Sequence, residues 1–264
     1  MGKLSVFVNG ISNNKRFLNN LFTEIGTEIS TEVNKNEILF YDIDDKKTDK
    51  LYSALAKNIL TEFSRKILVK IINKNCDYFS KSDKYEVWKM SMRRLADDEY
   101  ENNSDYLYRI KTVKNNLEEF LFNSETVFIE GFVNFRLKEL EDDLEEVVEE
   151  CVQEYLLELE YIEFVNMLKY FISVQSSKYL VVDVVYGDNI YIYADSKNIT
   201  QECLADFNRE VICTETNKDD FLLNSLISIA PKRVNIKQKN KQLNAEIKKT
   251  LLGIFGDRLK ITTE

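Results

Sequence analysis

The chain has 264 residues, a formal net charge of -9, 44% hydrophobic residues and 31% charged residues, a balance that excludes an intrinsically disordered protein. One proline and seven glycines are too few for the many turns of a β-sandwich or β-barrel, so helix is expected to be the majority state. The complete absence of histidine excludes Ser-His-Asp and Cys-His catalysis as well as His-ligated zinc.

The sequence carries no feature of an exported or membrane-spanning protein. No charged and apolar leader opens it, and no stretch reaches the ~18 uninterrupted apolar residues of a membrane helix. Its four cysteines show no C-x-x-C spacing; they are Cys76, Cys151, Cys203 and Cys213. We therefore expect a cytoplasmic protein without membrane insertion, whose cysteines are reduced and structural.

The first hundred residues predict a small β-α-β element followed by helices. Residues 4–8 and 37–43 have the pattern of strands, and residues 17–25 between them have that of a helix. Two neighbouring strands joined through a helix are expected to be parallel, with a right-handed crossover. A long amphipathic helix over 51–72 follows, and then two helices between 83 and 122, separated by the polar cluster at 102–105.

Residues 127–173 predict one long, nearly unbroken helix that changes character halfway along. In its first half, apolar residues recur every three or four positions and acidic residues fill the space between them, which is typical of one buried face. From 161 to 172 the only polar positions are Glu163, Asn166 and Lys169. We expect this second half to run through a core, with Tyr161, Phe164, Leu168 and Phe171 buried.

The C-terminal part predicts a small mixed sheet. Residues 179–186 and 190–194 flank a Gly-Asp-Asn turn and predict a β-hairpin, and a helix begins near Asn217. The segments SLISIAPKRVNI (225–236) and TLLGIFGDRLKI (250–261) align without gaps, each as a helix end, a breaker and a strand. A helix over 243–254 would make the two strands parallel neighbours.

The fold class expected from these elements is a predominantly helical α+β protein. It has an N-terminal β-α-β element, a helical middle with a long central helix, and a C-terminal β-hairpin followed by α-β-α-β. We predict three parts, which are 1–103, 104–177 and 178–264.

Two sets of residues are candidates for local chemistry. Asp42, Asp44 and Asp45 follow a strand, as the acidic ligands of Mg-dependent phosphatases do, but helix capping is the favoured interpretation. Arg136 is expected to lie over aromatic surface and to pair with a carboxylate such as Glu139, and recognition of an anionic ligand is the alternative.

Charge is distributed unevenly along the chain. Eleven acidic residues and no basic one lie between 139 and 160, a run best explained as a solvated helix face, with cation binding as the alternative. Residues 231–260 are strongly basic and could bind a polyanion, although no interleaved aromatic motif accompanies them. The candidate polyanion-binding residues are Lys232, Arg233, Lys237, Lys239, Lys241, Arg258 and Lys260.

Three segments carry a family resemblance, namely EGFVNFRL, LEYIEFVNMLKYF and DDFLLNSLISIAP. Together they resemble the YtxC-like family of sporulation-associated proteins from endospore-forming Firmicutes, over a region from about Ser104 to the C-terminus. The positions that carry the resemblance, expected to be structural, are Gly131, Phe132, Phe135, Arg136, Glu160, Tyr161, Phe164, Leu168, Phe171, Asp220, Ser225 and Pro231. The resemblance implies a role in sporulation and no particular reaction.

The function that these observations favour is a non-enzymatic interaction or structural role in the cytoplasm, with an unidentified protein partner. One alternative is a carboxylate- and Mg-dependent phosphate or phosphodiester enzyme. The other is binding of a polyanion such as nucleic acid through the basic segment 231–260. No cofactor and no resident metal is predicted, and the oligomeric state is left open.

Overall fold

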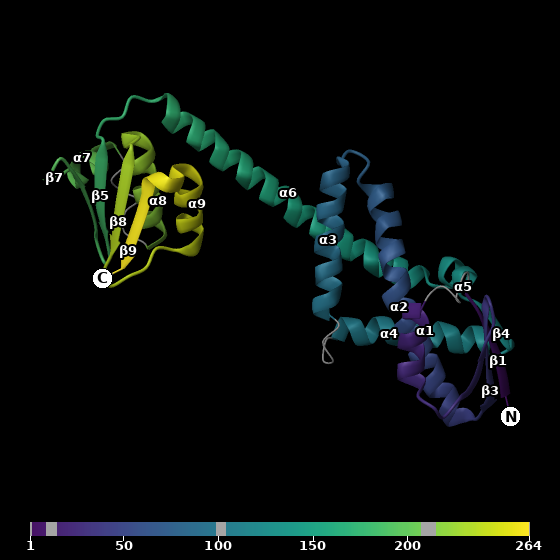
Figure 1. Cartoon of the computed structure of the whole chain (residues 1–264). Coiled ribbons are helices and arrows are strands. Elements are labelled where there is room, and N and C mark those ends of the chain that lie inside the picture. The colour runs from purple at the N-terminus through teal and green to yellow at the C-terminus, as the bar shows by residue number, and fades with distance from the viewer. Residues whose placement is uncertain (1, 9–14, 99–103, 207–214, 264) are drawn as a thin grey trace. The chain divides into compact units, whose positions relative to one another are not determined.

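The structure is a computed structural model that describes residues 2–8, 15–98, 104–206 and 215–263 (Figure 1). The chain divides into two compact units, Met1–Leu156 and Leu157–Glu264, which are described separately below as unit 1 and unit 2. The predicted fold class, predominantly helical α+β, is confirmed. The division into three parts stays a prediction.

Unit 1 contains a four-stranded sheet in the order β2-β3-β1-β4. Its strands are β1 (Gly2–Phe7), β2 (Ser30–Val33), β3 (Glu37–Ile43) and β4 (Thr126–Phe128). The prediction that β1 and β3 are parallel was wrong, because the two strands pair antiparallel. The polar segment that forms β2 makes an antiparallel pair with β3 and so reverses the chain direction between α1 (Lys15–Ile25) and β3.

The helices of unit 1 are built around one long amphipathic helix. They are α2 (Asp45–Asn75), α3 (Lys81–Asp98), α4 (Ser104–Leu121) and α5 (Ile129–Arg136). Helix α2 confirms the predicted 51–72 helix and buries most of its apolar residues between Leu51 and Ile72 in the core of unit 1, although Val69 is exposed. Helices α3 and α4 are the two predicted between 83 and 122, and Asn102 and Asn103 of the separating cluster lie outside the described residues.

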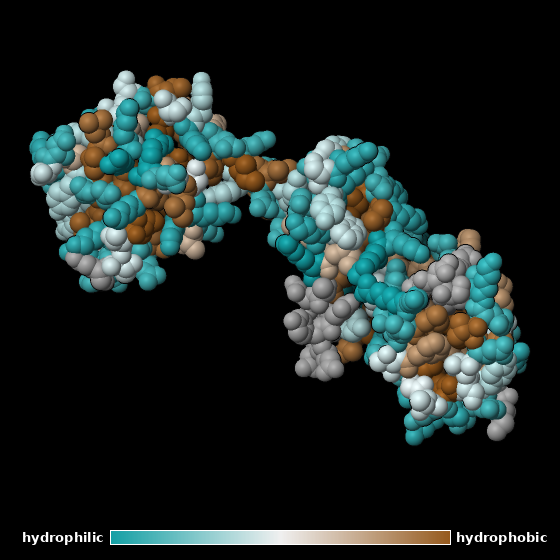
Figure 2. All heavy atoms as spheres, in the orientation of Figure 1, coloured by the Kyte–Doolittle hydropathy of each residue, from teal (hydrophilic) through white to brown (hydrophobic). Residues whose placement is uncertain are grey.

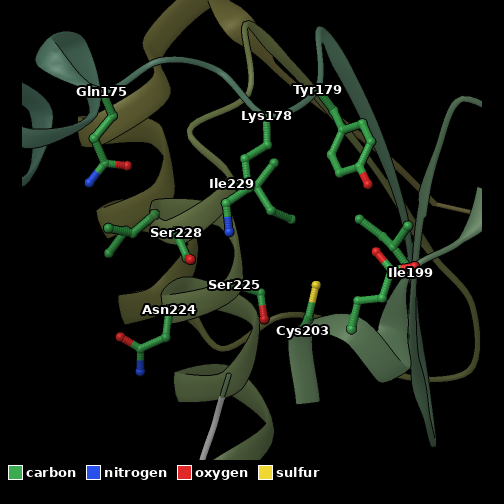
Figure 3. Close-up of a pocket in the computed structure, with 11 residues that line it drawn as sticks. Gln175, Lys178, Tyr179, Ile199, Cys203, Asn224, Ser225, Ser228 and Ile229 are labelled. Carbon is green, nitrogen blue, oxygen red and sulfur yellow. The ribbon is translucent and has the colours of Figure 1, made fainter. Parts of the chain in front are cut away.

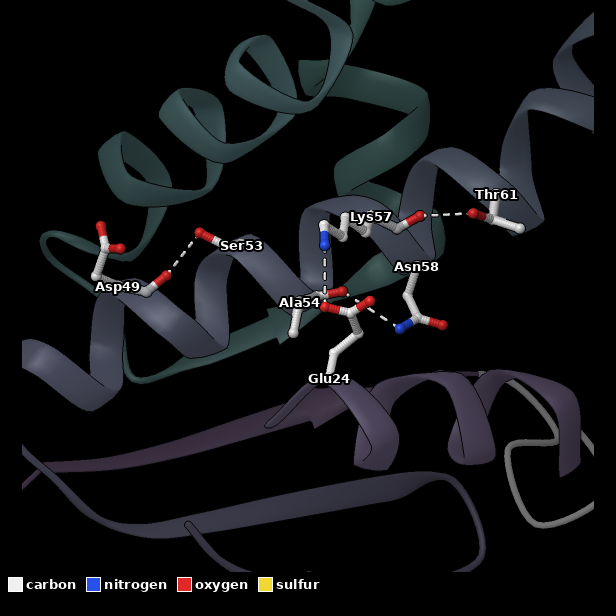
Figure 4. A network of polar contacts seen from close by, with 7 residues as sticks. All are labelled: Glu24, Asp49, Ser53, Ala54, Lys57, Asn58 and Thr61. Atoms are coloured by element: carbon white, nitrogen blue, oxygen red, sulfur yellow. Dashed lines mark hydrogen bonds and ion pairs between the residues drawn. The ribbon is translucent and has the colours of Figure 1, made fainter. Parts of the chain in front are cut away.

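Polar side chains of α2 form hydrogen bonds with the carbonyls of the same helix and one ion pair with α1 (Figure 4). Ser53 and Thr61 donate their hydroxyls to carbonyls one turn back, and Lys57 forms a 3.0 Å ion pair with Glu24 of α1. Buried Asn58 donates to the Ala54 carbonyl at 3.3 Å. The ion pair joins α1 to α2. The buried Asn58 amide nitrogen has a partner, whereas its amide oxygen makes no hydrogen bond with the described residues.

The long helix predicted over 127–173 begins later than expected and is interrupted once. Residues 126–128 form strand β4, and Leu137 separates α5 from α6 (Lys138–Val174) with the non-helical angles φ -105 and ψ 43. The stripe predicted from the spacing is buried, namely Leu137 just before α6 and Leu140, Leu144, Val147 and Cys151 within it, and Val148 is buried as well. The first half of α6 is therefore amphipathic, as the sequence indicates.

The acidic side chains of this half are paired with cations of the neighbouring helices. Lys70 of α2 contacts Glu141 at 2.7 Å, and Arg94 of α3 contacts Glu154 at 2.9 Å. Arg109 of α4, a buried residue, contacts Asp143 at 2.6 Å. Part of the acidic run therefore holds helices together, in addition to facing solvent.

Unit 2 is a five-stranded mixed sheet with helices on one face (Figure 1). The strand order is β7-β6-β5-β8-β9, and the described elements are β5 (Val181–Tyr186), β6 (Ile190–Ala194), β7 (Lys197–Asn198), α7 (Thr200–Asp206), α8 (Glu215–Ile229), β8 (Arg233–Gln238), α9 (Ala245–Phe255), a 3-10 turn (Gly256–Arg258) and β9 (Leu259–Thr263). The predicted hairpin is β5 and β6. The two strands of the repeat, β8 and β9, are parallel neighbours with α9 between them, so that prediction is also confirmed.

The C-terminal half of α6 packs on α9 through one side only. Val165 and Ile172 are buried in the core of unit 2, and the Tyr161 hydroxyl lies 3.0 Å from that of Thr250. Phe164 and Phe171 are exposed at 46% and 55%. The prediction that this half runs through a core was therefore wrong, because an apolar pattern records which faces avoid water and does not record what covers them.

Candidate functional site

The most prominent surface feature of unit 2 is a row of uncovered apolar side chains on α6, which we call the open stripe. Figure 2 shows apolar spheres on the visible face of this helix. The members of the open stripe, with their exposed fractions, are Leu157 66%, Phe164 46%, Met167 57%, Phe171 55% and Val174 62%. None of them belongs to the cores of the described residues.

The spacing of the open stripe is that of a helix-packing seam. Leu157, Phe164 and Phe171 recur every seven residues, and Met167 and Val174 each follow a phenylalanine by three. With roughly 100 Å² exposed per side chain, the five expose on the order of 500 Å². A contiguous apolar patch of this size on a protein surface typically marks an interaction site.

The surroundings of the open stripe are acidic. Glu158, Glu160 and Glu163 are exposed on the same stretch of α6, and Lys169 is the one basic residue between 157 and 174. A binding partner that brings its own acidic groups to this helix would be repelled, and one with basic groups beside an apolar surface would be attracted.

The first of the three motif segments is divided between the core and the surface. Phe132 is buried, whereas Phe135 is 84% exposed, so the expectation that these aromatic residues are core was wrong for Phe135. The Arg136 guanidinium lies over the Phe120 ring at 5.6 Å, which confirms the predicted aromatic contact. Gly131 is half-buried, with the nearest side-chain atom 3.9 Å from where a Cβ would lie.

In the other two segments, Tyr161 and Leu168 are half-buried, Ser225 and Pro231 are buried, and Glu160 and Asp220 are exposed. The structure brings Tyr161 against α9, where Lys249 lies over its ring at 4.7 Å. It does not gather the motif residues into one site. Half of the motif positions are exposed, namely Phe135, Arg136, Glu160, Phe164, Phe171 and Asp220, and the structural role expected for the motif stays a prediction.

Ser225 lines a pocket of about 530 Å³ between α7, α8 and residues 175–179 (Figure 3). Its hydroxyl is buried and makes no hydrogen bond with the described residues. Figure 3 shows the side chains of Ser225, Cys203 and Tyr179 directed into the same space, and Glu202 is the one carboxylate in the lining. The pocket offers a hydroxyl and a thiol for binding a small ligand.

Two of the other cysteines share a buried environment. Cys76 and Cys151 are free and buried, and burial raises the pKa of both thiols, which favours their protonated form. Cys213 lies outside the described residues. The expected structural role therefore fits Cys76 and Cys151.

Asp220 lines a second pocket, of about 630 Å³, together with Asp219, Glu246 and two lysines. The Tyr186 hydroxyl donates to Asp219 at 2.7 Å, which occupies one of these carboxylates. Among the described residues, no three His, Cys, Asp or Glu side chains are grouped so that they could hold a metal ion. The arrangement is a mixed-charge surface pocket.

The three aspartates after β3 serve the start of α2. Asp44 is the N-cap of α2, and its side chain accepts a 2.8 Å hydrogen bond from the backbone of Lys47. Asp45 occupies the first turn, where a negative charge favours the helix dipole. Asp42 has a φ of 57 and offers its carbonyl to the Lys47 ammonium. The favoured capping interpretation is confirmed for Asp44.

The basic residues of 231–260 separate into three groups. Arg233, Lys237 and Lys260 are exposed on strands β8 and β9. Arg258 instead donates to the carbonyls of Ile254 and Phe255 at the end of α9. The exposed residues outside the strands are Lys232, Lys239 and Lys241. The structure therefore brings three of the seven predicted residues to the sheet.

Two groups of functional candidates were missed in the sequence. Leu157, Met167 and Val174 were taken as part of an apolar helix, although they lie on a different face of it from the buried Val165 and Ile172. Tyr191 and Tyr193 were assigned only to a hairpin, although they alternate with buried residues and so share one face of β6.

Comparison with known proteins identifies a family. None of the curated proteins and none of the solved structures matches the chain. Within the described ranges, no helix has the length and apolar character needed to cross a membrane. The model of the YtxC-like family matches residues 49–260, beginning well before the first of the three motif segments. Because this match covers far more than half of the 264 residues, the chain belongs to the YtxC-like family.

Proposed function

We propose that this protein has a non-enzymatic role in the cytoplasm of a sporulating cell, in which the open stripe of α6 binds a protein partner. The observation that carries the proposal is the exposure of Leu157, Phe164, Met167, Phe171 and Val174 in one helical row. Leaving such a row in water forgoes the stabilisation of burying it, about 25 cal/mol per Å² of apolar surface. A partner that covers it supplies that stabilisation on binding.

The partner that fits best is a protein that presents an apolar helix flanked by Lys or Arg. Helices recognise grooves and other helices through anchors spaced at three, four and seven residues, the spacing of the open stripe. The exposed glutamates at 158, 160 and 163 favour a basic flank on the partner. They disfavour a second, parallel copy, since Glu160 would face Glu160 of that copy within the seam.

A photo-crosslinking amino acid placed in the open stripe tests the proposal in sporulating cells. The reactive residue at position 167 is expected to capture one defined protein, whereas the same residue at exposed Asn166, on the polar side of α6, captures none. The double substitution Phe164→Asp and Phe171→Asp is expected to abolish capture and to lower the yield of heat-resistant spores as far as deletion does. Circular dichroism of the purified variant verifies that it folds.

Three outcomes would contradict the proposal. Normal sporulation of the double variant would remove the role of the open stripe. A purified wild-type dimer that the double variant cannot form would assign the stripe to a second copy of the chain. Turnover of a phosphate substrate by the purified protein, lost on substitution of Asp219 or Asp220, would favour the enzyme alternative through the acidic pocket.

A further inference from the structure

The sheet of unit 2 is covered on one face and open on the other. Along β5 and β8, buried residues alternate with exposed or half-buried ones, and all buried side chains point toward the helices. Three of its strands, β5, β8 and β9, are parallel to one another. Parallel sheets nearly always have both faces covered, so an uncovered face of this kind is expected to receive a binding partner.

The strand register places aromatic and basic side chains together on the open face. Residues directly opposite one another on paired strands point to the same side of a sheet. One row across the sheet runs through Tyr193, Asp183, Asn235 and Lys260, and the next runs through Tyr191, Val185, Lys237 and Thr262. Arg233 lies opposite Val181 at the end of β8. Each row therefore begins at a tyrosine on β6 and reaches a lysine within two or three strands.

These side chains match the chemistry of an unpaired nucleic-acid strand. Aromatic rings on an open sheet stack on bases, and cations beside them bind phosphates. Tyr191 and Tyr193 are two residues apart on one strand and so about 7 Å apart along it, a spacing that two successive bases of an extended strand can follow. Asn235 is oriented by a 2.7 Å hydrogen bond to Asp183 and offers a polar group between Asp183 and Lys260 in its row.

The overall acidity of the chain does not belong to this unit. Residues 157–264 carry 14 Lys and Arg against 15 Asp and Glu, whereas residues 1–156 carry 22 against 30. Three cations, Arg233, Lys237 and Lys260, lie on the open face with the carboxylate of Asp183, and near-neutral charge of the unit permits a weak, salt-dependent attraction for phosphates. A double helix would meet the cations but would offer no base to the tyrosines.

We propose that the open face of β6, β5, β8 and β9 binds single-stranded nucleic acid, with Tyr191 and Tyr193 stacking on bases and Arg233, Lys237 and Lys260 holding the backbone. This site is separate from the open stripe and does not depend on the function proposed for it. The two tyrosines distinguish it from a general polyanion surface, because a phosphate-only ligand makes no use of aromatic rings.

Fluorescence anisotropy with labelled 12-nucleotide RNA and DNA strands, using the full chain, tests the cationic part of the proposal. Binding is expected to weaken with salt, with a slope of about 0.7 per phosphate contact. Lys260→Glu and Lys237→Glu are expected to reduce affinity and the salt slope. Lys248→Glu makes the same charge change on α9, on the covered side, and is expected to leave both unchanged.

The tyrosines supply the sharper test. Tyr191→Ala is expected to weaken binding about five-fold or more, while Tyr191→Phe, which keeps the ring, retains the affinity. Loss of affinity in both variants, or in neither, would overturn the stacking role. So would equal affinity for a duplex of the same length.

The same variants distinguish other anionic partners. Binding to vesicles that contain anionic lipid, without binding to either strand, would assign the face to a membrane surface and overturn the proposal. An equal effect of Lys248→Glu and Lys260→Glu would overturn it as well, since attraction would then follow net charge and not this face. Circular dichroism of each variant excludes loss of the fold as the cause.

Discussion

The two halves of α6 differ in a way that their composition does not suggest. The half in unit 1 is dominated by glutamate and aspartate, and most of its apolar residues are buried, with Leu144 fully inaccessible to solvent. The half in unit 2 is far richer in aromatic and aliphatic residues, yet Leu157 is 66% exposed. The more apolar half is therefore the less covered one.

This difference separates two uses of apolar surface. In unit 1 the stripe from Leu140 to Cys151 packs in the core with α2, α3 and α4. Folding therefore removes these apolar side chains from water, which stabilises the unit. In unit 2 the residues are divided, since Val165 and Ile172 belong to the core, while the side chains of the open stripe stay about half exposed and lie outside the cores of the described residues. The first set stabilises the chain, and the second is available to another molecule.

One substitution made in both halves tests the comparison most strongly. Leu144→Ala is expected to lower the free energy of unfolding by about 2 to 5 kcal/mol, because it leaves a cavity in a packed core. Leu157→Ala removes the same atoms from an exposed position and is expected to change it by no more than about 0.5 kcal/mol. Urea denaturation followed by circular dichroism measures both.

Equal losses from the two leucine variants would break the comparison. If Leu157→Ala were as costly as Leu144→Ala, the open stripe would be covered in the free protein, and its availability to a partner would have to be abandoned. A stability difference between the wild type and Leu157→Ala that disappears when both are diluted would point to self-association.

The next prediction concerns how closely the second half is held by α9. A Cβ added at Gly253 would lie 2.8 Å from a methyl group of Val165, too close without a shift of one helix. Gly253→Ala is expected to destabilise the protein by about 1 to 3 kcal/mol through overpacking, despite a gain of about 1 kcal/mol in helix propensity. A double-mutant cycle with Val165→Ala is expected to show coupling, and simple additivity would mean that the two helices do not meet at this point.

Much of the architecture follows from local pattern in the sequence. The hairpin, α2 and the repeated strand after Pro231 are set by periodicity and by breaking residues, and these were predicted with the correct pairing in unit 2. The direction of β3 was not predicted correctly, because the preceding strand β2 is short, polar and exposed along its whole length. Strand β2 has no alternating apolar pattern, so the sequence predicts neither this strand nor the chain reversal that it causes.

The candidate sites were harder to predict for a related reason. The helical pattern of 161–172 identifies apolar faces on most of the circumference, yet only the fold determines that α9 covers one of them. Likewise, Tyr191 and Lys237 are 46 positions apart in the sequence and share a face only through the register of β5 with β6 and β8. Single-sequence reasoning has no access to such pairings before the topology is known.

A smaller effect is expected from the polar contacts of the covered half. Asp143→Asn is expected to cost about 1 to 2 kcal/mol, because it weakens a charge-assisted bond to the buried guanidinium of Arg109 while Asp143 itself remains partly solvated. Glu141→Gln alters the more exposed pair with Lys70 and is expected to cost less than about 1 kcal/mol. Denaturation at low and high salt separates them, and a greater salt sensitivity of the Asp143 variant would contradict the assignment.

The smallest predicted effect lies where the covered half ends. The Tyr155 hydroxyl donates a 2.8 Å hydrogen bond to the Asp83 carboxylate. Tyr155 lies two residues before Leu157, the first residue of the open stripe. Hydrogen bonds from Ser80 and then from Tyr155 lower the pKa of Asp83 below its ordinary 3.8. Since the folded pKa is lower than the unfolded one, the stabilisation is complete above pH 3.8 and is lost as the pH falls through the folded pKa.

Asp83→Asn is therefore expected to remove this stabilisation near neutrality and to make unfolding less dependent on pH in the acidic range. Tyr155→Phe keeps the ring against Phe79, at 5.7 Å, but removes one of the hydrogen bonds, so it should reproduce part of that effect. Midpoints of urea denaturation between pH 2 and 7 measure both. If Tyr155→Phe left the acid dependence of unfolding unchanged, the Tyr155 hydroxyl would not stabilise the end of the covered half. The boundary between the two halves of α6 would then have to be placed earlier in the helix.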